Sequence, residues 1–420
     1  MELRSILVMM ILWVFSSEGH TQLANLYPGD VGIENDSSVV FTEFFDGQLD
    51  LIISRYDEIV NAAGMSLDED VPPGSMGSQS LRITSSSGLN TGGHLYKSFD
   101  SGFDGTVYLR YYVKYPSESK NYFHHESVRM GGYHPPLPFP HPRAGTCGLG
   151  DSRLSVTFEP VWQNTDPPGM DTYLYWGDMR SWNADGSSCF GNVMITEGVT
   201  QYGNPPATGT YPTVVFDEWM CVEIMVKLND PVTEYNGELA IWVDGEQVGH
   251  WGPGFPNGHW LRDKWYNNPS DPPFEGFRWR TDPNLNINWI WLLFFHSNPD
   301  APASYIKYDH IVMANQYIGP IFNATTEVDD NSDEITEVVV FPNPSGSSFN
   351  IKVSNLDSPD SEGKISVLNL WGEKVFSSTI AIGQTTSEVD LSGLPDGVYF
   401  LIIDSGSRVL NRKIVKNSGS

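Results

Sequence analysis

The stretch Asp217–Val248, DEWMCVEIMVKLNDPVTEYNGELAIWVDGEQV, decides the fold class of this chain. Apolar residues occupy the even positions of Met220–Leu228, a period of two that is typical of a β-strand with one buried face. The pair Asn236-Gly237 favours a tight turn. In Leu239–Val243 the same rule places Trp242 on the face opposite the core. The stretch therefore predicts two antiparallel strands that pair with each other.

The rest of the 420-residue chain has the composition of an all-β protein. Aromatic residues make up 13% of it, and 40 glycines and 29 prolines divide it into short segments. Trp289–Phe295 (WIWLLFF) is a short apolar run with polar boundaries, which indicates a buried strand. Only Asp50–Ala63 (DLIISRYDEIVNAA) has the period of a helix. These features favour a large double-sheet β-jelly roll, which we expect to span residues 20–322.

The opening stretch is similar to the paired strands of jelly-roll polysaccharide lyases of the glucuronan-lyase and alginate-lyase-like kind. In that group a strand ending in VKLN turns through NG into a strand of the form L-x-WVDG; here Val226–Asn229 is VKLN and Trp242–Gly245 is WVDG, with Leu239 three residues before Trp242. Ser80–Ile83 and Gly92–Leu95 resemble the opening strands of the same group. The resemblance spans Phe41 to Tyr317 and implies a concanavalin-like sandwich. Laminarinase-type hydrolases and lectins share that architecture, so the chemistry has to be argued from the site.

Strand parity predicts which side chains face a bound polysaccharide. In Thr106–Tyr115 it separates an apolar face from a face of tyrosine, arginine and lysine. Aromatic rings on such faces stack on pyranose rings, and the cations meet acidic sugars. The residues predicted to bind substrate are Tyr108, Lys114, Lys227, Trp242, Arg278 and Arg280.

A lyase mechanism gives these side chains specific roles. Cleaving a uronic-acid polymer by β-elimination requires loss of the C5 proton, and that is feasible only when the charge of the neighbouring carboxylate is neutralised. An arginine would neutralise it, and a tyrosine or histidine would serve as base and acid. The predicted catalytic residues are Arg110, Tyr112, His124, His125 and Tyr175, with Tyr173, Arg278 and Arg280 as further candidates.

The sequence also contains candidates for other types of site. Glu159 and Glu223 are candidates for the two carboxylates of a glycoside hydrolase, although no stretch resembles the E-x-D-x-x-E strand of laminarinase-type hydrolases. His134 and His141 lie in a proline-dense segment, which favours a stiff loop over a metal site. The loop Asp263–Pro273 offers oxygen ligands for a structural calcium ion, and turn chemistry explains it equally well. We expect no required cofactor and no other metal.

Three cysteines fit an exported protein with one disulfide bond and one thiol left over. Cys147 and Cys189 lie in glycine-rich loop contexts and are predicted to form the bond. Cys221 lies within a predicted strand, so an inert buried thiol is expected there.

The charge of the chain is strongly acidic. It has 24 lysines and arginines against 52 aspartates and glutamates, which argues against binding nucleic acid through the general field. Thr325–Glu337 (TTEVDDNSDEITE) holds six acids and no base. A run of this kind is typical of a solvated linker, which we place at residues 323–337.

The two ends of the sequence predict export. Arg4, the apolar run Ile6–Phe15 and the small polar residues after it have the order of a secretory signal peptide, assigned to residues 1–19. At the other end, Phe341–Pro344 (FPNP) and Gly397–Phe400 (GVYF) precede a basic terminus. Residues 338–420 resemble the C-terminal sorting domain of the type IX secretion system of Bacteroidetes-type bacteria. The resemblance implies a small Ig-like sandwich, the type IX machinery as a partner, and transport through the periplasm to the medium or the outer cell surface.

The sequence thus leaves three functions open. A secreted lyase acting on a uronic-acid-containing polysaccharide is the first, a non-catalytic carbohydrate-binding surface protein is the second, and a glycoside hydrolase is the third. All three functions have a polysaccharide as partner. We expect no transmembrane segment in the mature protein, because the longest apolar runs are shorter than the roughly 20 residues that cross a bilayer.

Overall fold

The protein is described by a computed structural model in which two compact units are recognised, residues 1–325 and 326–420. The structure describes residues 22–88, 92–119, 125–136, 145–147, 150–160, 167–194, 212–295, 300, 302–322, 337–343, 345–354, 362–369, 374–381, 387–404 and 409–417. The predicted signal peptide and nearly all of the predicted linker lie outside these ranges. Among the described residues, no helix is long and apolar enough to cross a membrane.

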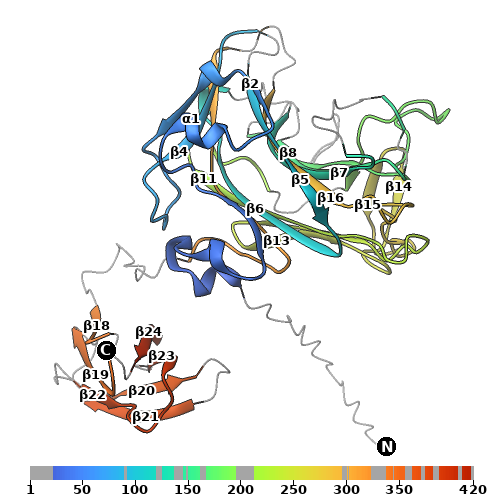
Figure 1. Ribbon diagram of the computed structural model, residues 1–420. Helices are drawn as coiled ribbons and strands as arrows, with labels where there is room; N and C mark the ends of the chain where they lie inside the picture. Colours follow the sequence, from blue (N-terminus) through green and yellow to red (C-terminus); the bar gives the residue numbers. More distant parts are fainter. Residues whose placement is uncertain are drawn as a thin grey trace, which may run out of the picture. The chain divides into compact units, whose positions relative to one another are not determined.

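The first unit is a sandwich of two large antiparallel sheets (Figure 1). The larger sheet has eight strands in the order β13-β12-β11-β6-β17-β4-β3, with β1 also paired to β17. Its strands are β1 (Val39–Glu43), β3 (Met65–Asp68), β4 (Ser80–Ser85), β6 (Thr106–Lys114), β11 (Trp219–Lys227), β12 (Glu238–Val243), β13 (Glu246–Trp251) and β17 (Ser304–Ala314). The opening stretch of the sequence forms β11 and β12, which pair from Val222↔Val243 to Lys227↔Glu238 as expected.

The second sheet has six strands in the order β2-β5-β16-β7-β8-β9. Its strands are β2 (Glu58–Val60), β5 (Gly93–Phe103), β7 (His125–Tyr133), β8 (Arg153–Pro160), β9 (Met170–Tyr175) and β16 (Ile287–Phe295). The apolar run at Trp289–Phe295 is thus the predicted buried strand, and it lies between β5 and β7.

A smaller sheet continues the six-stranded one beyond β9. The backbone groups of Leu174 and Asn192 exchange two hydrogen bonds of 2.9 and 2.8 Å, and Asn192 leads directly into β10. Strand β10 pairs with β15 in parallel, and β15 pairs with β14. The bounds of these strands are β10 (Val193–Met194), β14 (Gly258–Leu261) and β15 (Lys264–Asn267).

The core lies between the two large sheets because each strand turns alternate residues inward. On β6 the inward residues are Val107, Leu109, Tyr111 and Val113, as parity predicts, and all are buried in one apolar cluster. The facing strand β7 contributes Val128 and Met130 to the same cluster. Each sheet therefore has an outer face that the core does not use.

The outer face of the eight-stranded sheet is covered by two chain segments. Residues 22–36 form three 3-10 turns, η1 (Leu23–Leu26), η2 (Pro28–Asp30) and η3 (Ile33–Asn35), and residues 315–322 follow β17. Leu23, Ile33 and Ile318 pack with Tyr108 and Met225 in a separate buried cluster. These two segments therefore bury the outward-facing side chains of β6 as well.

The predicted helix at Asp50–Ala63 is wrong in extent. Only α1 (Leu49–Ile53) is helical; Glu58–Val60 forms β2, which pairs with β5, and Ala62–Gly64 is the 3-10 turn η4. Pairing with an existing sheet satisfies the backbone of this segment, and that tertiary contact overrides the local helical period. A further 3-10 turn, η5, spans Ser117–Ser119.

The second unit is a small sandwich of its own. One sheet has the order β18-β19-β22 and the other β21-β20-β23-β24. The strands are β18 (Glu337–Phe341), β19 (Ser348–Ser354), β20 (Glu362–Leu368), β21 (Lys374–Ala381), β22 (Ser387–Asp390), β23 (Gly397–Asp404) and β24 (Val409–Lys416). Phe349, Ile365, Leu401 and Ile414 bury one core between the two sheets. The chain is therefore all-β, a jelly-roll sandwich followed by a small β-sandwich.

The cysteines are arranged as the sequence indicates. Cys147 and Cys189 form a disulfide bond, and Cys221 is a buried free thiol in β11. Burial raises the pKa of the Cys221 thiol, so it stays protonated at neutral pH and does not act as a nucleophile.

Candidate functional site

Arg110, predicted to neutralise a substrate carboxylate, is instead a buried structural cation. Both of its terminal nitrogens donate to the carboxylate of Asp30, and Nη1 also donates to the carbonyl of Gly319 at 3.1 Å. Asp30 accepts a second partner, since its Oδ2 lies 2.6 Å from Nδ1 of His310. The side chain of Arg110 is 0% exposed. The segment that covers β6 leaves no face on which Arg110 could meet a polymer.

The other predicted residues of this face are covered in the same way. The hydroxyl of Tyr112 accepts a 2.8 Å hydrogen bond from the backbone of Ile321. Tyr108 packs in a ring cluster with Trp242 and Tyr317, with centroids 6.1 and 6.3 Å from those rings. Strand parity correctly predicted that these side chains point away from the core between the sheets. The inference that they border a groove is wrong, because the covering segments bury them.

The remaining predicted cations are scattered and paired. Lys114 contacts Asp70 at 2.9 Å, and Lys227 contacts Glu238 at 2.7 Å. Arg278 makes two 2.8 Å bonds to Asp178, whereas Arg280 is buried against Asp104 and the carbonyls of Pro283 and Leu285. The segment Phe277–Arg280 is not a strand. These residues therefore do not converge on one site with Arg110.

The predicted pair of hydrolase carboxylates is also separated. Glu223 lies on the covered face of the eight-stranded sheet, where it accepts backbone hydrogen bonds from Ile318 and Gly319 at 2.8 and 2.7 Å. Burial raises its pKa to about 7. Glu159 lies on β8 of the other sheet. The two carboxylates belong to opposite outer faces of the sandwich and cannot act on one bond.

The outer face of the six-stranded sheet brings together ionisable and aromatic side chains that could act on a substrate. Register places Trp291 opposite Arg129, Thr157 opposite Tyr173, and Ser155 opposite Tyr175. His125, Ser127 and Arg129 alternate with the core residues of β7, while Thr157 and Glu159 alternate with those of β8. Side chains directly opposite each other share a face. We call this set, with Trp291, Tyr173 and Tyr175, the β7–β9 face.

Glu159 joins Arg129, Ser127 and His125 in one hydrogen-bonded cluster on this face. Glu159 accepts from Arg129 Nη2 at 2.9 Å and from Ser127 at 3.2 Å, and its other oxygen lies 2.7 Å from Nδ1 of His125. The Nε atom of Arg129 is buried and has no hydrogen-bond partner within the described ranges. A buried guanidinium nitrogen with no acceptor is costly, so a ligand that supplied one would bind favourably.

The protonation states in the cluster follow from burial and charge. Burial alone would raise the pKa of Glu159, but Arg129 and His125 outweigh it and lower that pKa to about 2. For His125, burial is the largest cause and lowers the pKa, with the charge of Glu159 opposing it. At neutral pH the cluster is therefore a carboxylate and a guanidinium beside a neutral imidazole.

Two tyrosine hydroxyls lie beside this cluster on the β7–β9 face. The hydroxyls of Tyr173 and Tyr175 lie 2.9 Å apart. The Tyr173 ring is 5.1 Å from the His125 ring and 5.5 Å from the guanidinium carbon of Arg129. Burial raises the pKa of both hydroxyls, so both remain protonated at neutral pH and can donate protons.

Aromatic side chains extend the face across β16 and β5. The guanidinium of Arg129 lies 5.6 Å from the Trp291 ring, and His94 meets that ring edge-on at 5.4 Å. Phe295 lies 6.0 Å from His125. Flat apolar rings next to polar groups are the usual surface for sugar rings.

Sequence reasoning named His125, Tyr173 and Tyr175 but missed Arg129. The alternation of His125–Tyr133 (HESVRMGGY) carries the signal that could have found it, since Arg129 is four residues after His125 and must share its face. Of the other histidines, His124 and His141 lie outside the described residues, and His134 is 4.0 Å from Asp282.

No metal centre is evident in the described part of the chain. It contains no group of three or more histidine, cysteine or acidic side chains that could hold an ion. In the proposed calcium loop, Asp271 lies 2.6 Å from Nδ1 of His259, and Asn268 and Asn267 serve in turn and side-chain hydrogen bonds. Turn chemistry accounts for those contacts, and calcium binding there stays an untested expectation.

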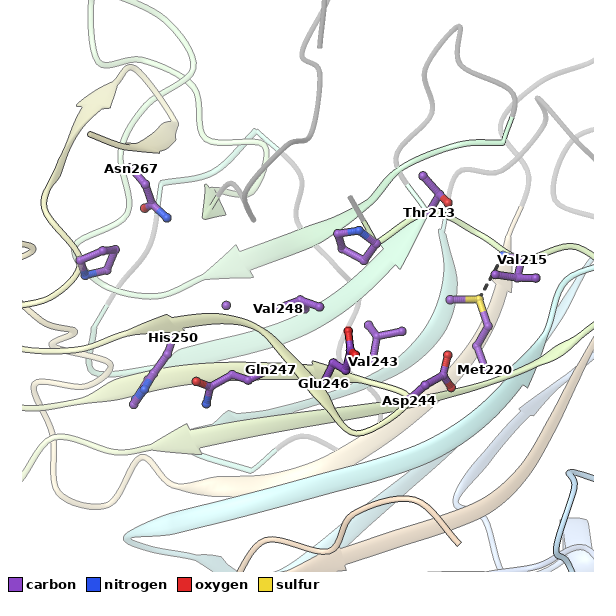
Figure 2. Close-up of a pocket in the computed structure, with 13 residues that line it drawn as sticks. Thr213, Val215, Met220, Val243, Asp244, Glu246, Gln247, Val248, His250 and Asn267 are labelled. Atoms are coloured by element: carbon purple, nitrogen blue, oxygen red, sulfur yellow. Dashed lines mark hydrogen bonds between the residues drawn. The ribbon is translucent and has the colours of Figure 1, made fainter. Parts of the chain in front are cut away.

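A separate hollow of about 690 Å³ opens beside the edge strand β13 (Figure 2). Glu246, Gln247, Val248 and His250 line it from β13, and Asn267 lies across from them. The described residues of its walls include Asp244 and Glu246 but no lysine or arginine, and such a lining is poorly suited to an acidic sugar. The β7–β9 face, which carries the arginine, is the better candidate site.

The position of Tyr173 depends on a glycine. Gly191 has φ of +90°, and a Cβ there would stand 2.4 Å from the Tyr173 ring. We expect Gly191→Ala to cost about 1–3 kcal/mol of stability more than Gly186→Ala. Gly186 has φ of +77° with open space around it, so it isolates the backbone cost. Equal losses of stability in chemical denaturation of the two variants would contradict this contact.

Comparison with known proteins bears mainly on the second unit. Residues 339–417 match the family model described as "Secretion system C-terminal sorting domain". A search of curated protein sequences gave no match.

Several solved structures align with part of this chain at low similarity. The Emp47p carbohydrate recognition domain is 10% identical, with 63% of this chain and 98% of that chain covered and a TM-score of 0.28. A structure described as "Prominent members of the human gut microbiota express endo-acting O-glycanases to initiate mucin breakdown" is 11% identical, with coverage of 66% and 99% and a TM-score of 0.33. The VIP36 exoplasmic/lumenal domain in its Ca²⁺/Man3GlcNAc-bound form is 8% identical, with coverage of 64% and 95% and a TM-score of 0.30.

Similarity of this extent supports no argument about the activity of the larger unit. The match over residues 339–417 is of a different kind, because it agrees with the motifs FPNP and GVYF and with the small sandwich that contains them. The chain therefore carries a type IX secretion C-terminal sorting domain, which indicates export to the cell surface or into the medium.

Proposed function

We propose that this exported protein is a polysaccharide lyase that cleaves a uronic-acid-containing chain by β-elimination on the β7–β9 face. The observation that carries the proposal is that Arg129 and a neutral His125 both contact Glu159, while the guanidinium of Arg129 lies against the ring of a protonated Tyr173 on the same sheet face. Those are a charge neutraliser, a base and an acid, the three groups that the elimination needs.

Arg129 would hold the carboxylate of the sugar being cleaved. Its Nη2 is held by Glu159, whereas its Nε has no partner among the residues described and offers a donor to an incoming oxygen. A guanidinium beside a carboxylate withdraws charge as the C5 carbanion develops, which stabilises the transition state more than the ground state.

His125 would accept the C5 proton. Its Nδ1 is engaged by Glu159, so exchange with a sugar would go through Nε2. The lowered pKa keeps the ring neutral and able to accept a proton at neutral pH, and Glu159 stabilises the imidazolium that forms.

Tyr173 would donate a proton to the leaving oxygen. The bond between C4 and that oxygen breaks as the C4–C5 double bond forms, and the hydroxyl of Tyr175 lies 2.9 Å from that of Tyr173. Because burial raises the pKa of both hydroxyls, an acid role suits them better than a base role.

Carbohydrate binding without catalysis is the second candidate, and the rings of Trp291, His94 and Phe295 on this face favour it. Hydrolysis is less well supported. A general acid must be protonated near the working pH, and the pKa of Glu159 is about 2.

The deciding experiment follows ultraviolet absorbance of the new C4–C5 double bond when the purified chain acts on glucuronan, alginate, ulvan and pectin-type polymers. We expect absorbance to rise on at least one of them. Retardation in a gel that contains the polymer, without any cleavage, would instead support the binding protein. New reducing ends without the absorbance would identify a hydrolase. If the chain neither bound nor cleaved any of these polymers, the proposal would be refuted.

A further inference from the structure

A second buried cation, Lys264, shares the outer face of the extended sheet with Arg129. Strand β15 follows β9 and β10 in the continuous sheet, and Lys264 stands opposite Val193. Met194 and Trp265, the next residues on these strands, are both in the core. Since neighbours along a strand point to opposite faces, Val193 and Lys264 point outward.

The same alternation links this position to the β7–β9 face. Leu174 pairs with Asn192, and Thr172 exchanges contacts with the backbone of Met194, so Tyr173 lies level with Val193. One row across the strands therefore runs from Trp291 and Arg129 through Thr157 and Tyr173 to Lys264. Four strand spacings of about 4.8 Å separate Arg129 from Lys264 along this row, or about 19 Å.

The surroundings of Lys264 distinguish it from an ordinary surface lysine. It is only 7% exposed, and burial lowers its pKa to about 8 against the opposing charges of Asp263 and Asp171. It remains mostly protonated at neutral pH. Next to it on β14, Leu261 is exposed, and beyond it the rings of Tyr266 and His259 stack at 5.9 Å.

We propose that Lys264 binds a second carboxylate of the same polyuronate chain, several sugars away from the one held by Arg129. The polysaccharide would then cross the strands along the row, with the Tyr173 ring between the two charged contacts and the Trp291 ring on the far side of Arg129. This inference rests on the proposed function. It adds that the substrate is a continuous polyanion and that the enzyme gains affinity from a long segment of it.

The test compares the chain with Lys264→Gln on oligouronates prepared from the polymer that the absorbance assay identifies. A charge-assisted hydrogen bond contributes about 1.5–3 kcal/mol, so KM for long oligomers should rise at least about tenfold in Lys264→Gln. The kcat value on long oligomers, and kcat/KM on trimers too short to reach Lys264, should stay unchanged.

Lys264→Arg is the matched variant, because it keeps the charge and should retain most of the affinity for long oligomers. Thermal unfolding of both variants reports whether the site has simply lost its structure. Equal KM values for Lys264→Gln and the unmodified chain on long oligomers would overturn this inference and leave the lyase function intact. Equal losses on trimers and long oligomers would also overturn it. Absence of binding and cleavage in the unmodified chain would refute the proposed function itself.

Discussion

Replacing Arg110 by alanine is expected to lower the free energy of unfolding of the larger unit by about 3–5 kcal/mol. The substitution leaves the carboxylate of Asp30 buried beside His310 without its main counter-charge. It also removes the donor to Gly319 O, which helps to hold the segment after β17 against the sheet. A buried charge that loses its partner keeps its desolvation cost, which explains the large magnitude.

Urea denaturation followed by tryptophan fluorescence measures this effect. Arg82→Ala is the control, because Arg82 lies on β4 of the same sheet and pairs with Asp68 at 3.5 Å while partly exposed. An ion pair of that kind contributes at most about 1 kcal/mol. If Arg110→Ala lost no more stability than Arg82→Ala, the buried network would not hold the covering segment. The folded fraction of Arg110→Ala should keep its kcat, since Arg110 is remote from the β7–β9 face.

Arg129→Lys is expected to reduce kcat on the responsive polymer by about 10²–10³-fold. Lysine keeps the positive charge but lacks the planar fork that bonds Glu159 on one side and leaves Nε for substrate on the other. The loss should therefore appear in turnover, with the folded state largely retained. Initial rates from double-bond absorbance, with thermal unfolding in parallel, measure the two effects separately.

Arg82→Ala again serves as the control for Arg129→Lys. Arg82 lies over the ring of Tyr305 at 3.7 Å, as Arg129 lies over Tyr173, but on the other sheet. It should leave kcat within about twofold of the unmodified chain, because it touches no group of the mechanism. Full activity of a folded Arg129→Lys protein would remove Arg129 from the mechanism.

Much of the fold followed from alternation alone. The periods of two in Thr106–Tyr115 and Met220–Leu228 placed each residue of β6 and β11 on the correct side of the sheet. The structure of the segment after α1 could not be predicted in this way, because Glu58–Val60 pairs with β5 in a contact that no local pattern reveals. Local periods are reliable where a strand's own residues determine burial, and they fail where a distant strand does.

The site was harder to predict, for a related reason. Parity assigned Arg110 and Tyr112 to an outer face but could not say that residues 22–36 and 315–322 cover that face. Arg129 and His125 lie on the outer face of the other sheet by the same rule. Choosing between two such faces requires knowing what covers each of them, and that is a property of tertiary structure.

The cover over Arg110 also has a consequence for the order of folding. The backbone of Leu23 donates to Tyr317 at 3.1 Å, that of Ala24 to Ile318 at 2.9 Å, and that of Gly29 to Phe322 at 3.0 Å. These bonds join the two ends of the larger unit, so forming them closes a loop that contains nearly all of the unit's residues. Contacts of such long sequence separation are slow to form because of the loop entropy they cost. We therefore expect the covered face to close late in folding, after the strand pairs of the two sheets have formed.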